Sequence, residues 1–194
     1  MRKRNIALLL VLIVILASCL AACNSPKQID GFYKKLEKAD SATMVIEMQT
    51  FLGKFLMTYK TEGNKTYSSA SFDEDEKYTE TVDGKVYVYQ KNLNGRWTKT
   101  LSTEEEEEAV PGITELFSSE NYTYSKDLKK FVLKEGVNPE FLDGLVSDTL
   151  TLEISDGICV LNGEIQTDGL GLVMPFTITI KDLNKTVVTL PQVA

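Results

Sequence analysis

The side chains that could perform chemistry are few in this chain, and histidine is absent from its 194 residues. Without imidazole there is no Ser-His-Asp triad, no Cys-His nucleophile and no metal site built on histidine. Cys159 is the one cysteine beyond residue 23, so the sequence excludes a disulfide framework. Because Cys159 lies between Ile158 and Val160 in a predicted strand, we expect a buried structural thiol and not an activated nucleophile.

The acidic residues show no arrangement typical of a catalytic or metal site. Five consecutive glutamates, Glu104–Glu108, follow Ser102 and Thr103, and they indicate a solvated acidic loop or the start of a helix. Consecutive residues point in different directions, so this run lacks the spacing of metal ligands. We therefore expect no metal, no cofactor and no enzymatic activity. A hydrolase that uses two carboxylates is kept as a third hypothesis. The first two hypotheses, which are both binding functions, are given below.

The first 23 residues have the features of an export signal. Arg2, Lys3 and Arg4 precede an apolar run over residues 6–16, which is too short for an ordinary transmembrane helix. The sequence Leu20-Ala21-Ala22-Cys23 resembles the lipobox of bacterial lipoproteins. The resemblance implies cleavage just before Cys23 and attachment of a diacylglycerol to its sulfur. It also implies a signal peptide over 1–22, a lipidated cysteine and tether over 23–25, and a position on the extracytoplasmic face of the cell membrane.

Two alternatives to this interpretation stay open at the level of sequence. Cys19 ends a second segment of the same kind, but polar Asn24 and Ser25 follow Cys23, and we place the lipid on Cys23. The other alternative is an uncleaved membrane anchor with incidental cysteines. Without residues 1–22 the chain holds 18 basic and 28 acidic residues, a net charge of −10. Such an acidic body excludes nucleic-acid binding by counterion release. It is also not attracted to an anionic membrane, so the acyl chains must hold it there.

An amphipathic helix is predicted from Pro26 to about Ala39. Its apolar residues follow the i, i+3, i+4, i+7 pattern of one helix face: Ile29, Phe32, Tyr33 and Leu36. The polar side holds four lysines, namely Lys27, Lys34, Lys35 and Lys38. Because the helix starts so close to Cys23, these lysines either contact anionic lipid or simply solvate an outer face.

From Ser41 onward the apolar period changes to two, which predicts strands. The first half indicates a meander of about six strands, including an alternating segment that begins at Phe51. Asp83-Gly84 and Asn94-Gly95 predict tight hairpin turns of type I′. In the second half, strands are predicted at 131–133, 150–154, 158–165, 172–180 and 186–190, with a short helix that begins at Asn138. Pro175 lacks an N–H group, so the strand over 172–180 is predicted to be at an edge or bulged.

These elements predict one α+β domain over residues 26–194, in which a large antiparallel sheet packs on the N-terminal helix and one or two short helices. The order of elements resembles the LolA-like lipoprotein-carrier superfamily, which includes LppX-like lipoproteins. The segments that carry the resemblance are the helix at 26–39, then 44–48, 63–67, 86–89, 95–97 and 185–191. It implies an open, strongly curved half-barrel whose concavity holds acyl chains, although some members act as partners of other envelope proteins.

A lipid-anchored envelope protein that binds or carries a lipid or another hydrophobic molecule is the first expected function. The candidate lining consists of Met44, Ile46, Met48, Phe55, Met57, Met174 and Phe176. Methionine adapts to apolar chains of varied shape, but the same residues would also serve as a plain core. The alternative is a protein-interaction module with a filled core, which docks an envelope protein through its acidic loop or the strand with Pro175. Tyr87, Tyr89 and Trp97 suit either function, because aromatic cross-strand pairs stabilise sheets without any ligand.

Overall fold

The computed structural model describes residues 25–71, 76–102, 116–137, 139, 142, 144–146, 149–166 and 171–193. The predicted signal peptide, Cys23 and the glutamate run Glu104–Glu108 lie outside these residues. Of the predicted short helix at 138–142, only Pro139 and Leu142 are described.

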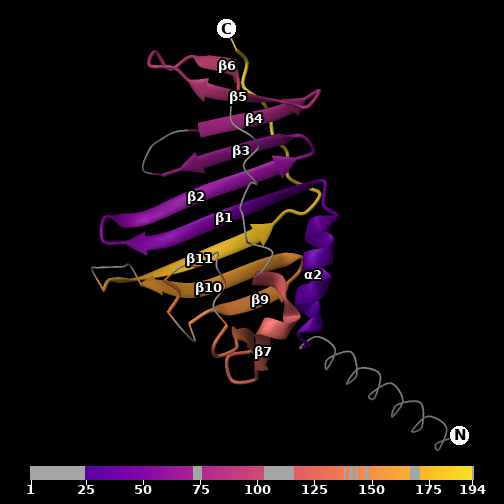
Figure 1. The fold of residues 1–194 in the computed structure, drawn as a ribbon, viewed down its shortest axis with the longest axis vertical. Helices are drawn as coiled ribbons and strands as arrows, with labels where there is room; N and C mark the ends of the chain where they lie inside the picture. The colour runs from indigo at the N-terminus through magenta and orange to yellow at the C-terminus, as the bar shows by residue number, and fades with distance from the viewer. Residues whose placement is uncertain are drawn as a thin grey trace, which may run out of the picture.

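Within the described residues, eleven antiparallel strands form one open sheet. Their bounds are β1 Ser41–Thr50, β2 Gly53–Glu62, β3 Lys65–Ala70, β4 Glu76–Val82, β5 Lys85–Lys91, β6 Trp97–Leu101, β7 Tyr122–Ser125, β8 Lys130–Leu133, β9 Thr151–Ser155, β10 Ile158–Gln166 and β11 Val173–Lys181. The strand order is β6-β5-β4-β3-β2-β1-β11-β10-β9-β8-β7. The first and last strands therefore meet at the centre, and one meander extends from each side of them (Figure 1). This arrangement confirms the predicted six-strand meander and the antiparallel α+β class.

Two of the hairpin turns have the backbone that their residues predict. Asp83 and Gly84 have φ values of 51° and 71°, and Asp156 and Gly157 have 50° and 78°, as a type I′ turn requires. The prediction for Asn94-Gly95 is wrong, because only Gly95 has a positive φ there. The turn is longer, and the Asn92 carbonyl and side chain accept hydrogen bonds from the amides of Gly95 and Arg96.

Three further predictions about strands are wrong. Phe51 and Leu52 form the turn between β1 and β2 and are not part of a strand. Pro175 lies on β11, which is a central strand, so the predicted edge position is wrong. The ladder between β1 and β11 ends at the Met48–Phe176 pair, and Pro175 therefore has no partner residue on β1. Residues 186–190 form no strand, because their amides bond to side chains. The Thr186 amide donates to Ser41 Oγ at 3.1 Å and the Val188 amide to Glu62 Oε2 at 2.9 Å.

The predicted N-terminal helix is confirmed as α2, Lys27–Glu37, which lies beside the sheet (Figure 1). Its buried residues, Ile29 and Phe32, join a core that includes Leu152, Leu161 and Ile178. We call the face of the sheet that carries this core the inner face and the opposite one the outer face. None of the helices in the described part of the chain is long and apolar enough to cross a membrane.

The helix is fixed at its polar flank as well as at its apolar face. It contacts β9 and the 3-10 turn η2, Ser119–Asn121. The Asp30 carboxylate accepts hydrogen bonds from the Ser119 amide at 3.1 Å and the Ser119 hydroxyl at 2.8 Å. Phe32 and Phe117 add a ring contact with 5.7 Å between centroids. These contacts place α2 over the β9 side of the inner face.

Candidate functional site

The seven predicted lining residues lie on one face of three adjacent strands. The register pairs Met48 with both Phe55 and Phe176, and Ile46 with Met57. Alternate residues of a strand share a face, so Met44 on β1 and Met174 on β11 belong to the same set. The strands involved are β2, β1 and β11, at the centre of the sheet. We call these seven side chains the apolar face.

Most of the apolar face is only partly covered. Phe176 is buried, whereas the other six side chains are half-buried. Met44, Ile46 and Met48 pack against the buried core. Phe55 and Met57 continue the same face onto β2. The residues therefore join the core on one side and form a partly solvated apolar surface on the other.

Phe176 is positioned by a glycine on the neighbouring strand. Gly163 pairs with Phe176, and a Cβ at Gly163 would lie 2.8 Å from the phenylalanine ring. The ring therefore lies over the bare backbone of β10, in a space that no other residue type leaves open. This contact fixes the position of the Phe176 ring, at the boundary between the core and the half-buried residues.

A groove on the outer face has a different character. It has a volume of about 420 Å³ and lies beside the C-terminal segment. Its lining residues are Thr43, Val45, Thr58, Lys60, Lys181, Asp182, Thr186 and Val187. With three threonines and three charged side chains, it offers hydrogen bonds and little apolar surface. It does not suit an acyl chain, so the apolar face remains the candidate site.

Cys159 is buried on β10, which confirms the expectation of a structural thiol. Burial raises the pKa of this thiol to about 12, so it stays protonated and unreactive at neutral pH. Burial, and then the nearby Cys159, raise the pKa of Tyr122 on β7. The Tyr122 hydroxyl is buried and has no hydrogen-bond partner within the described residues.

Alkaline conditions are expected to destabilise the protein through Cys159. The folded chain keeps the thiol proton at pH values where the unfolded chain, with a pKa of 9.0, has lost it. The contribution of the protonated thiol to the free energy of unfolding is thus complete below about pH 9. It is lost as the pH rises towards 12, by about 1.4 kcal/mol per pH unit. Urea unfolding of the chain from residue 24 measures this slope. Cys159→Ala should reduce it, and an unchanged slope in that variant would refute the assignment.

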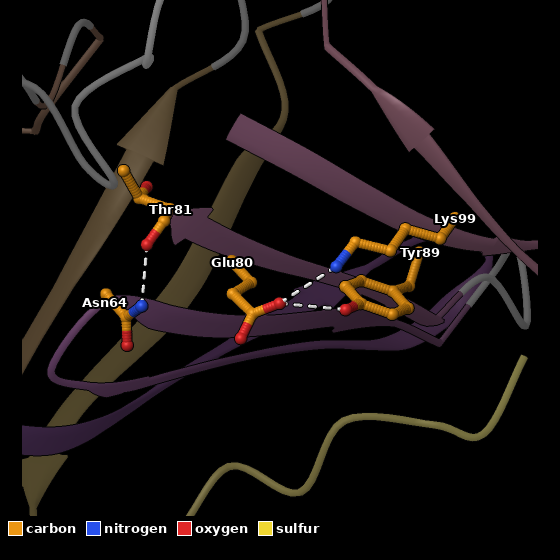
Figure 2. Close-up of polar contacts among 5 residues, drawn as sticks. All are labelled: Asn64, Glu80, Thr81, Tyr89 and Lys99. Carbon is orange, nitrogen blue, oxygen red and sulfur yellow. Dashed lines mark hydrogen bonds and ion pairs between the residues drawn. The ribbon is translucent and has the colours of Figure 1, made fainter. Parts of the chain in front are cut away.

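The outer face of β3 to β6 carries a network that joins aromatic rings to charged groups. The Glu80 carboxylate accepts hydrogen bonds from the Tyr89 hydroxyl at 2.9 Å and from Lys99 Nζ at 3.2 Å (Figure 2). Lys99 Nζ also lies 4.3 Å from the ring centre of Tyr87. Figure 2 shows that Glu80, Tyr89 and Lys99 come from three neighbouring strands, so the network ties these strands together.

Aromatic contacts continue on the same face, between residues of β3, β4 and β6. The ring centres of Tyr67 and Tyr78 are 4.9 Å apart, and those of Tyr78 and Trp97 are 5.3 Å apart. Lys91 Nζ covers the Trp97 ring and pairs with Glu76 at 3.0 Å. These rings meet each other edge-on or tilted, and the rings of Tyr67 and Trp97 also lie under lysine ammonium groups. This geometry favours the stabilising role for Tyr87, Tyr89 and Trp97.

Glu80→Gln is expected to lower the stability of the sheet at neutral pH by about 1 kcal/mol, because it weakens two charge-assisted bonds. The hydrogen bonds from Tyr89 and then Lys99 lower the pKa of Glu80 below its ordinary 4.5. Its stabilising effect is therefore complete above about pH 4.5 and is lost as the pH falls through the lowered value. Urea midpoints of the two proteins should converge in acid, and a constant difference would contradict this role.

No group of three or more aspartate, glutamate or cysteine side chains that could hold a metal ion occurs among the residues with described positions. Comparison with known proteins adds no assignment. No protein-family model matches the chain, and no curated protein matches its sequence.

Proposed function

We propose that this protein is a lipid-anchored, non-enzymatic protein of the bacterial cell envelope that binds a lipid or another hydrophobic molecule on its apolar face. The observation that carries the proposal is the gathering of seven apolar side chains on one face of β2, β1 and β11, with Phe176 alone fully buried. Contiguous, partly solvated apolar surface is typical of ligand and interaction sites.

The composition of this face favours a flexible, elongated ligand. Four of its seven residues are methionines, whose unbranched thioether side chains repack around apolar chains of different shapes. The aromatic residues Phe55 and Phe176 add rigid apolar area. An acyl chain of a phospholipid or a fatty acid such as palmitate satisfies both features, because it needs dispersion contacts and no fixed polar partners.

A half-barrel curvature belongs to the proposal, as does the likeness to LolA-like carriers. It is supported by the packing of α2, whose buried Ile29 and Phe32 join one core with Leu152, Leu161 and Ile178 on the inner face. A sheet that curves around a helix buries both elements in this way.

The membrane anchor is supported by the sequence before α2. The basic start, the apolar run over 6–16 and Cys23 fit a lipidation signal. Two acyl chains on Cys23 bury enough methylene groups for stable anchoring. A ligand taken from the bilayer would then have a short path to the domain.

Titration with cis-parinaric acid, a fluorescent fatty acid, tests the binding function. The chain from residue 24, purified without detergent and extracted with organic solvent, is expected to give saturable fluorescence that palmitate displaces. Fluorescence that rises without saturation, or that palmitate leaves unchanged, would refute hydrophobic-ligand binding.

The alternative function, docking of another envelope protein, is favoured by a separate observation. Phe51 and Leu52 in the β1–β2 turn are 77% and 72% exposed. Leu172 and Val173, at the start of β11 beside the end of β1, are also exposed. A crosslinker placed at the exposed Val173 would capture a protein partner if this function holds. Double substitution of Phe51 and Leu52 by serine should then abolish capture and leave parinarate binding unchanged.

A further inference from the structure

The outward side of α2 carries a row of lysines. Lys27, Lys34 and Lys38 are seven and four residues apart, so on a helix with 3.6 residues per turn they lie within about 40° of one another. All three are exposed, and they lie opposite the buried Ile29 and Phe32. We call these three residues the lysine stripe.

The charges of the lysine stripe are not neutralised by the rest of the described chain. None of the three forms an ion pair among the described residues, where the four ion pairs use Lys54, Lys91, Lys99 and Lys130 of the sheet. Of the two acidic side chains of α2, Asp30 accepts hydrogen bonds from Ser119. Burial, and then the charge of Glu37, raise the pKa of Tyr33, so Glu37 acts on that tyrosine.

We propose that the lysine stripe lies along the surface of an anionic lipid bilayer and thereby fixes the orientation of the domain. Its charge is opposite to that of anionic headgroups, whereas the chain from Cys23 onward carries −10 and would otherwise be repelled. The inference rests on the anchoring at Cys23 that is part of the proposed function. Lys27 is four residues from Cys23, which spans at most about 14 Å of extended chain.

This arrangement gives α2 two roles on its two sides. The apolar side closes the β9 end of the inner face, and the basic side contacts headgroups. Because α2 contacts β9, binding of the stripe sets the position of the sheet relative to the bilayer. Each near-surface lysine strengthens binding to anionic lipid about fivefold. At raised ionic strength this attraction is screened.

Amine acylation followed by mass spectrometry tests the contact at single lysines. The full chain, lipidated in a bacterial host, is reconstituted in vesicles of phosphatidylcholine alone or with phosphatidylglycerol. We expect acylation of Lys27, Lys34 and Lys38 to slow about fivefold or more in the anionic vesicles and to recover at high salt. The exposed lysines Lys77 and Lys126 of the sheet and its turns serve as internal controls and should react equally in both.

Equal acylation of the lysine stripe in both vesicle types would overturn the inference, and the three lysines would then only contact solvent. Sedimentation of the same samples separates this failure from that of the anchor. Protein that pellets with both vesicle types but shows no protection contradicts the stripe alone, whereas protein that pellets with neither contradicts the proposed anchoring. Charge reversal of Lys34 and Lys38 to glutamate should abolish protection at Lys27, and the matched reversal of Lys77 and Lys126 should not.

Discussion

Met57→Lys is expected to abolish binding of a hydrophobic ligand while the protein stays folded. Met57 is half-buried on the inner face of β2, where it pairs with Ile46. A lysine there can extend its ammonium group to solvent, so the fold tolerates it. An acyl chain on the same face would instead desolvate the charge, which costs several kcal/mol and is larger than the gain from its contacts. Parinarate titration measures the loss, and circular dichroism confirms the fold.

Leu56→Lys is the matched control for this variant. Leu56 precedes Met57 in β2, but it points to the outer face and is 37% exposed. The same new charge therefore lies outside the proposed site, and binding should stay unchanged. Equal loss in both variants, or full binding by Met57→Lys, would contradict the placement of the ligand on the apolar face.

Phe176→Ala is expected to lower the free energy of unfolding by about 3–5 kcal/mol. The ring is 4% exposed and lies against Gly163 on β10, between the core and the half-buried residues. Its removal leaves a cavity at the centre of the sheet that glycine cannot fill. Urea unfolding of the chain from residue 24 measures the change.

Val173→Ala provides the comparison on the same strand. Val173 is 49% exposed, so its truncation should alter the free energy of unfolding by no more than about 0.5 kcal/mol. A small effect of Phe176→Ala, similar to that of Val173→Ala, would show that the ring is not held in a packed core.

The sequence was sufficient to predict most strands and the composition of the apolar face. Alternation alone places Met44, Ile46 and Met48 on one side of a strand, and the Asp-Gly turns define the hairpins. The pairing of β1 with β11 was not predictable, because it joins residues more than a hundred positions apart. The missing N–H of Pro175 predicts an edge or a bulged strand, although β11 lies at the centre.

Other features depend on contacts that a local pattern does not contain. The strand β7, Tyr122–Ser125, is short and its polar residues mask its alternation, so the sequence pattern does not predict it. Residues 186–190 have strand-forming side chains, yet Ser41 and Glu62 supply their acceptors in place of a neighbouring strand. The Glu80 network likewise requires the register of β4, β5 and β6, which only the assembled sheet defines.

Native mass spectrometry of the chain from residue 24, purified from a bacterial host without detergent, tests the central claim most directly. The account predicts a stoichiometric lipid adduct, identified by organic extraction, that is present in the Leu56→Lys variant and absent from Met57→Lys. A chain that has only its own mass, both as purified and after incubation with envelope phospholipids, would contradict hydrophobic-ligand binding by this protein.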